Sequence, residues 1–175
     1  MRLKVTKKQN CARRCLVCGL ENALGLRAQY YELEDGTLAG LVTARSEHQS
    51  YPGRVHGGVI TALLDETIGR AVNIAEPDTW AVTAEISVRF KKPVPYGVPL
   101  LVVGRVTDNN RRLFSGTGEL LLPDGCVAAS ATARYRKLKL ADIADFAAAG
   151  DDWAVHPSPA DPAEIEIPDS VCQRK

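Results

Sequence analysis

Residues 57–72 read Gly-Gly-Val-Ile-Thr-Ala-Leu-Leu-Asp-Glu-Thr-Ile-Gly-Arg-Ala-Val, and this stretch decides the fold. It is the only long helical candidate within the first 140 residues. A surface helix keeps its apolar residues in one stripe, whereas here they spread around most of the circumference. A helix that is apolar nearly all round is buried, so we expect a sheet to wrap around it. The residues that make this pattern are Val59, Ile60, Leu63, Leu64, Ile68 and Val72.

The sequence on either side of this helix predicts six strands. Two precede it around the turn Glu34-Asp35-Gly36, and four follow it. In residues 82–90 apolar and polar residues alternate with a period of two, which is typical of a strand with one buried face. The predicted fold class is α+β, with an antiparallel sheet wrapped around one long central helix. The expected strands are residues 26–33, 37–45, 82–90, 100–106, 113–122 and 127–138.

Two flanking segments differ in composition from this unit. Residues 1–25 are polar, basic and contain three cysteines, and we expect them to be irregular. Residues 141–175 are acidic and rich in proline, which predicts an extended or disordered tail, with a candidate Ala-rich helix near residues 143–149. The chain is thus expected to hold one globular domain, residues 26–140, between these two segments.

The distribution of charge bears on the class of ligand. Residues 1–140 contain 20 Lys and Arg against 13 Asp and Glu, while the tail contains 2 against 8. A basic body suits an anionic ligand, whereas nucleic acid usually requires a stronger and more clustered excess. No stretch approaches the roughly 18 apolar residues of a membrane span, and the basic N-terminus lacks the apolar run of a signal peptide. We therefore expect a cytoplasmic protein that binds neither nucleic acid nor a membrane.

Three of the five cysteines are close in sequence, with the spacing Cys11-x3-Cys15-x2-Cys18. Iron–sulfur clusters of radical enzymes use this spacing, but those enzymes need a much larger barrel than this chain could build. Zinc would require a fourth ligand, which only His48 or Cys126 could supply by approaching in space. We expect all five cysteines to be free thiols, with no metal and no cofactor.

The start of the central helix is unusual. A helix normally begins after Ser, Thr, Asp or Asn, but here Gly57 and Gly58 follow His56. Unobstructed N–H groups at the positive end of a helix can bind an anion or a developing oxyanion. The alternative is that His-Gly-Gly is only a tight turn.

Asp65 favours the functional interpretation. It lies within the buried helix, where a carboxylate without a partner is costly, and no cation lies three or four residues away. Glu66, by contrast, has Arg70 at i+4, so a surface ion pair accounts for it. We therefore predict that Asp65 is the functional carboxylate and that Glu66 is structural.

The spacing of these residues has a consequence for assembly. His56 and Asp65 are nine residues apart, which is about 13 Å along a helix axis. One small substrate carbonyl could hardly contact both residues of the same chain. A two-fold axis could bring the helix N-terminus of one subunit to the Asp65 of another, so we expect a homodimer, or a homotetramer built from it.

The same residues carry a resemblance to a known family. His56-Gly57-Gly58 with Leu64-Asp65-Glu66 and Gly69 is similar to the signature of the hotdog-fold acyl-CoA thioesterases, particularly the PaaI-like branch. The opening Cys15-Leu16-Val17-Cys18-Gly19 also resembles that branch, although Ala23 stands where a proline is common. The resemblance covers residues 15–138 and implies a hotdog fold.

The resemblance implies hydrolysis of an acyl-CoA to a free acid and CoA. The thioester carbonyl would accept hydrogen bonds from Gly57 and Gly58 and be polarised by His56, while Asp65 of the partner subunit acts as general base or nucleophile. Five further residues are candidates for substrate binding. Two precede the helix and would hold water or the acyl group, and three end a strand and would bind the phosphates of CoA, unless they are simply solvated: Gln49, Tyr51, Arg89, Lys91 and Lys92.

Two other functions remain open at this point. The domain could bind acyl-CoA without catalysis, although retention of both the His-Gly-Gly turn and Asp65 argues against this. It could also hydrate an enoyl thioester, which would require a different pairing of acid and histidine. The acyl group itself depends on the depth and shape of the pocket, which the sequence does not show.

Overall fold

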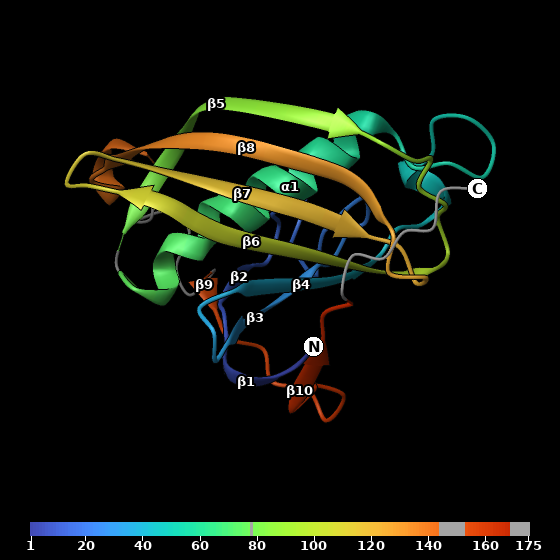
Figure 1. Cartoon of the computed structure of the whole chain (residues 1–175), viewed down its shortest axis with the longest axis horizontal. Helices are drawn as coiled ribbons and strands as arrows, with labels where there is room; N and C mark the ends of the chain where they lie inside the picture. Colours follow the sequence, from blue (N-terminus) through green and yellow to red (C-terminus); the bar gives the residue numbers. More distant parts are fainter. Residues whose placement is uncertain (78, 144–152, 169–175) are drawn as a thin grey trace.

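The computed structural model describes residues 1–77, 79–143 and 153–168. An eight-stranded antiparallel sheet, in the order β10-β1-β3-β4-β6-β7-β8-β5, curves around one long helix (Figure 1). A separate pair of short strands joins β2 to β9. The strands are β1 (Arg2–Lys8), β2 (Cys11–Ala12), β3 (Gln29–Leu33), β4 (Leu38–Thr43), β5 (Trp80–Phe90), β6 (Pro99–Asn109), β7 (Leu113–Leu121), β8 (Val127–Leu138), β9 (Trp153–Ala154) and β10 (Glu164–Glu166).

The central helix α1 (Gly57–Ala71) is buried, as its apolar circumference predicts. It packs against β4, β5, β6, β7 and β8, and Leu64 and Ile68 are fully buried in the main core. The helix ends one residue earlier than predicted, because Val72 begins a 3₁₀ turn, η2 (Val72–Ile74). Two further 3₁₀ turns are η1 (Ser46–His48) and η3 (Leu140–Asp142). The predicted architecture of a sheet wrapped around one long helix, which is the hotdog fold, is confirmed.

Small residues in the sheet let the helix approach closely. A β-carbon added to Gly116 on β7 would lie 2.6 Å from Cγ2 of Ile68, which is closer than real β-carbon contacts. On β6, a β-carbon at Gly104 would lie 2.8 Å from the carbonyl oxygen of Thr67. The backbone of β6 and β7 therefore lies directly against α1 at these glycines, with no space for a side chain between them.

Strand β5 departs from the predicted alternation. Its pairing with β8 shifts between Thr83 and Glu85, which places a bulge at Ala84. As a result Thr83 faces the helix, whereas Val82, predicted to face inward, is exposed. Beyond the bulge Ile86 and Val88 pack against the core as predicted.

The two flanking segments are more ordered than expected over their described parts. Residues predicted to be irregular form β1, which pairs with both β3 and β10. The acidic tail folds back onto the body, where the carboxylate of Asp161 lies 2.7 Å from Nζ of Lys8. Ile165 and Ile167 pack with Leu3 in a second apolar cluster. This cluster lies on the face of β3 and β4 that is turned away from the main core. The candidate helix at 143–149 lies almost wholly outside the described residues.

Candidate active site

The N-terminus of α1 is capped by the side chain of His56. Its backbone is extended (φ −65°, ψ 137°), and its Nδ1 accepts a hydrogen bond from the Gly58 N–H at 2.9 Å. A neutral imidazole that accepts at Nδ1 carries its proton on Nε2, so the exposed edge of the ring is a hydrogen-bond donor. The sequence showed no residue of the usual capping types here, and histidine supplies the missing acceptor.

This cap changes which helix amide is available to a ligand. The Gly58 N–H is already engaged by His56, contrary to the expectation that both glycine amides are open. The Gly57 N–H has no acceptor among the described residues. The helix start therefore offers the Gly57 N–H, with the Nε2–H of His56 as a second donor.

The loop that precedes the helix is held by a second histidine. His48 is buried, its Nδ1 accepts from the Arg45 N–H at 2.9 Å, and its Nε2 lies 2.9 Å from the Leu24 carbonyl. The His48 carbonyl in turn accepts from the His56 N–H at 2.8 Å. Both ring nitrogens of His48 are thus committed to the backbone, which leaves neither free to ligate a metal.

A surface cleft of about 450 Å³ opens beside the start of α1. Gly57 lies in it, with Phe90 and Val94 among its apolar residues and Lys91 and Lys92 among its charged ones. Its full lining is Ser50, Tyr51, Arg54, Val55, Gly57, Ile60, Phe90, Lys91, Lys92, Pro93 and Val94. The combination of apolar wall, lysine pair and helix N-terminus suits a ligand with both an apolar part and an anionic part.

The structure brings together only some of the predicted binding residues. Tyr51, Lys91 and Lys92 line the cleft with Gly57. Gln49 and Arg89 are exposed and do not line it, and His56 and Gly58 flank Gly57 but are not part of the lining either. Arg54, which the sequence reasoning did not select, belongs to the cleft, and no local pattern distinguished it from other loop arginines.

Asp65 lies on α1 where the helix meets β5 and β8. The Thr83 hydroxyl donates to its carboxylate oxygens at 2.9 and 3.1 Å, and the Tyr135 hydroxyl is shared between Oδ1 at 3.0 Å and the Asp65 backbone carbonyl at 2.9 Å. No ion pair to Asp65 is found among the described residues, so its partners are two hydroxyl groups and no cation. The side chain is half-buried, and the expectation of a carboxylate without any partner is corrected to one held by neutral donors.

The tyrosine at this position remains a donor. Burial, followed by the negative charge of Asp65, raises the pKa of Tyr135 well above its usual range. The hydroxyl therefore keeps its proton and fixes the orientation of the carboxylate. Asp65 is not part of the cleft lining, and it lies eight residues beyond Gly57, about 12 Å along the helix.

Glu66 and Arg70 form the predicted ion pair, but the prediction that this pair lies on the surface is wrong. Nε of Arg70 lies 2.7 Å from the Glu66 carboxylate, but the arginine side chain is only 7% exposed. Its Nη1 donates to the Asn10 carbonyl at 2.8 Å, and its guanidinium stacks over the rings of Tyr30 and Trp153. Sequence spacing predicted the pair, but burial depends on the N-terminal segment and tail that cover it.

Comparison with known proteins defines the class. The family model of the thioesterase superfamily matches residues 52–136, from the loop before α1 to the end of β8. This segment, 85 of the 175 residues, resembles the thioesterase superfamily, as the His-Gly-Gly and Leu-Asp-Glu motifs predicted.

Individual relatives agree with this assignment. The chain is 28% identical over 120 residues to the mouse (Mus musculus) acyl-coenzyme A thioesterase THEM4, covering 67% of this chain and 51% of that protein. It is 35% identical to the crystal structure of RHA08564, a thioesterase superfamily protein, with a TM-score of 0.64 over 71% of this chain and 60% of that one. It is 26% identical to the BH2602 protein of Bacillus halodurans, solved with CoA, with a TM-score of 0.60 over 67% of this chain and 78% of that one. The chain spans about half the length of the curated relatives it matches.

The likeness to the PaaI branch is one of fold. The PaaI protein of E. coli, from the phenylacetic acid degradation operon, is 17% identical with a TM-score of 0.59 over 65% of this chain and 80% of that one.

Among the described residues, no helix is both long enough and apolar enough to cross a bilayer.

Proposed function

We propose that this protein is an acyl-CoA thioesterase, which hydrolyses the thioester to a carboxylic acid and CoA. The observation that carries the proposal is that Gly57, whose N–H has no acceptor among the described residues, lines a cleft together with Lys91 and Lys92. The name of the THEM4 relatives and the CoA bound to the BH2602 protein support the choice of substrate class. The cytoplasmic location expected from the sequence stays a prediction.

The cleft assigns a role to each of its groups. Lys91 and Lys92, with Arg54, attract the phosphates of CoA. The apolar residues Ile60 and Phe90 also line the cleft, and they suit the pantetheine arm and acyl chain. The thioester carbonyl accepts hydrogen bonds from the Gly57 N–H and from Nε2–H of His56. Both donors stabilise the oxyanion that develops when the carbonyl is attacked.

The attacking group comes from Asp65 in this proposal. As a general base, its carboxylate takes a proton from water while the water oxygen attacks the carbonyl carbon and the CoA thiolate leaves. As a nucleophile, it would form an acyl anhydride that water then hydrolyses. In either route the hydroxyls of Thr83 and Tyr135 hold the carboxylate in position.

The site is proposed to lie between two subunits of a homodimer. Asp65 lies eight residues beyond Gly57 on α1, about 12 Å along the helix axis, so one chain does not supply both groups to one carbonyl. Strand β5 ends the sheet and is eleven residues long, and an edge of this length is usually covered. Pairing of β5 with its copy across a two-fold axis would bring the helix start of one subunit toward Asp65 of the partner subunit. A homotetramer would need further contacts.

Free-thiol release from a panel of short, medium and aromatic acyl-CoAs tests the activity. The wild-type protein is expected to release CoA from at least one of them. Asp65→Asn is expected to lower kcat/KM at least about a hundredfold, which corresponds to ~2.7 kcal/mol of barrier. Asp108→Asn, an exposed carboxylate on β6, is the matched control and should leave the rate unchanged.

The alternatives give different outcomes in the same experiment. Tight acyl-CoA binding without thiol release across the panel would favour a non-catalytic binding module. Consumption of an enoyl-CoA without thiol release would favour a hydratase. Undiminished release by Asp65→Asn would keep the activity but remove Asp65 from the mechanism.

A further inference from the structure

Two cysteines and two charged side chains form a cluster that the proposed hydrolysis does not use. Cys15 and Cys18 lie in one turn, closed by a hydrogen bond from the Gly19 N–H to the Cys15 carbonyl at 3.0 Å. The Sγ atoms of both cysteines and a carboxylate oxygen of Glu66 lie within 4.8 Å of one another. On the other side, Nη2 of Arg70 donates to Sγ of Cys18 at 3.1 Å.

The turn is built so that the two thiols face each other. A β-carbon at Gly19 would lie 2.3 Å from the Cys15 carbonyl oxygen, so only glycine permits this closure. Sγ of Cys15 accepts from the Val17 N–H at 3.3 Å and the Cys18 N–H at 3.5 Å. Both cysteines are reduced, and residues three apart on one turn lie side by side. Small side-chain rotations can therefore bring the sulfurs to the about 2 Å of a disulfide.

The two thiols differ in access and in acidity. Cys15 is partly exposed, whereas Cys18 is fully buried. The hydrogen bond from the Cys18 thiol lowers the pKa of Cys15 to about 6, although burial opposes this. The same hydrogen bond, together with burial, raises the pKa of Cys18 far above its usual range. Near neutral pH the accessible sulfur is thus a thiolate and the buried one keeps its proton.

The chemistry of this cluster favours a redox function of the two cysteines over the binding of a metal ion. Zinc takes four ligands, and the described residues supply three here. The guanidinium of Arg70, which is 7% exposed, already provides a positive charge to both Glu66 and Cys18. A cation bound between the sulfurs would lie close to this fixed positive charge and be repelled by it.

We propose that Cys15 and Cys18 form a redox-active dithiol that exchanges with small-molecule disulfides such as glutathione disulfide. The Cys15 thiolate attacks one sulfur of the disulfide, forms a mixed disulfide and releases one thiolate. Cys18 then gives up its proton to that released thiolate, attacks the Cys15 sulfur and expels the second thiolate. Starting from the Cys15 thiolate and the Cys18 thiol, the protein gives up two electrons and one proton, and the small-molecule disulfide is reduced to one thiol and one thiolate.

Trapping of the disulfide intermediates by mass spectrometry tests this in the protein of residues 1–175. After incubation with glutathione disulfide and acid quenching, alkylation and peptide mapping should find a Cys15–Cys18 disulfide that dithiothreitol reverses. Cys18→Ser should stop at a stable glutathione adduct on Cys15, because the resolving thiol is missing. Cys15→Ser should give no adduct on Cys18, which is buried. Cys11→Ser, a neighbouring buried cysteine, is the matched control and should behave like the wild type.

The rate of Cys15 alkylation by iodoacetamide should rise with pH through a midpoint near 6, the pKa of this thiol. The proposal would be overturned by the absence of an internal disulfide in excess glutathione disulfide. It would equally be overturned by adducts spread over all cysteines, or by a metal that co-purifies in equal amount with the protein and protects Cys15 until a chelator removes it. The readout is a covalent mass change, so failure here is distinct from a lack of thioesterase activity.

Discussion

At the scale of single residues, the carboxylate of Asp65 is set apart by the chemistry of its partners. Glu76 binds Lys137 at 2.7 Å, and the hydrogen bond from that lysine lowers the pKa of Glu76 to about 2. Asp65 receives only hydroxyl hydrogen bonds, from Thr83 and Tyr135. These donors orient the carboxylate, which in the proposed mechanism acts on water or on the thioester carbonyl.

Removal of one of these donors should reduce turnover and leave substrate binding unchanged. Thr83→Val keeps the shape of the side chain but removes the hydroxyl that holds Asp65, so we expect kcat to fall about tenfold with little change in KM. Thr79→Val is the matched control, because the Thr79 hydroxyl donates to Glu76 at 2.7 Å rather than to Asp65. Steady-state kinetics on the best acyl-CoA measure both variants. An equal loss in the two would show that the effect is not specific to Asp65.

His56 carries two functions that substitution can separate. His56→Ala removes the cap on the Gly58 N–H and should lower the free energy of unfolding by about 1 kcal/mol. His56→Asn restores a capping oxygen and should keep nearly wild-type stability in urea denaturation. Both variants lack the Nε2–H donor, so both should lose thioesterase activity. Equal destabilisation by the two substitutions would argue against the capping role.

At the scale of elements, the sequence predicted the features that depend on neighbouring residues, but not those that depend on pairing between distant strands. The distribution of apolar residues in 57–72 predicted α1 to within one residue, because burial all around a helix is visible in its own 3.6-residue period. The bulge at Ala84 was not predictable, because the register of β5 is set by its pairing with β8 about fifty residues later. That bulge turns Thr83 toward Asp65, so part of the candidate site depended on it. The pairing of β1 with β10 is equally remote in sequence.

The close approach of α1 to the sheet can be tested at Gly116. A methyl group there would contact Cγ2 of Ile68 at 2.6 Å and the Arg105 carbonyl oxygen at 2.7 Å, so the helix or the strand must shift. Gly116→Ala is expected to lower the free energy of unfolding by about 1–3 kcal/mol. Ser115→Ala, the adjacent position on β7 and therefore on the opposite face of the strand, should stay within about 0.5 kcal/mol of the wild type. Denaturant unfolding of both variants measures this difference. A Gly116→Ala protein of wild-type stability would mean that the space between β7 and α1 can accommodate a methyl group.

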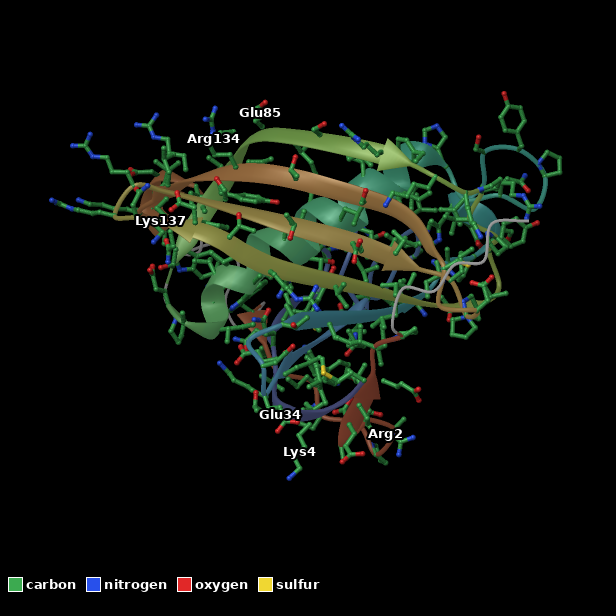
Figure 2. All side chains as sticks on the ribbon, viewed as in Figure 1. Arg2, Lys4, Glu34, Glu85, Arg134 and Lys137 are labelled. Atoms are coloured by element: carbon green, nitrogen blue, oxygen red, sulfur yellow. The ribbon has the colours of Figure 1, made fainter. Side chains whose placement is uncertain are left out.

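At the scale of the whole molecule, the outer side of the sheet and its edge have different characters. Glu85 and Arg134 lie on the outer side, away from α1, and pair at 3.1 Å as an exposed ion pair (Figure 2). The edge strand β5, which also carries Glu85, leaves Val82 and Phe90 exposed, 37% and 55%, toward its two ends. These exposed apolar residues support the proposed pairing of β5 with its copy in a second subunit.

Complementation between two inactive subunits tests whether the site is shared. Gly57→Pro removes the Gly57 N–H but suits the first position of a helix, and the extended backbone of His56 is compatible with a following proline. This variant and Asp65→Asn should each be nearly inactive as homodimers. A purified heterodimer of the two should regain about half the wild-type activity. One of its two sites combines the intact helix start of one chain with the intact Asp65 of the partner subunit, while the other site lacks both. If each site were built within a single chain, every site in the heterodimer would carry one defect, and mixing would restore nothing.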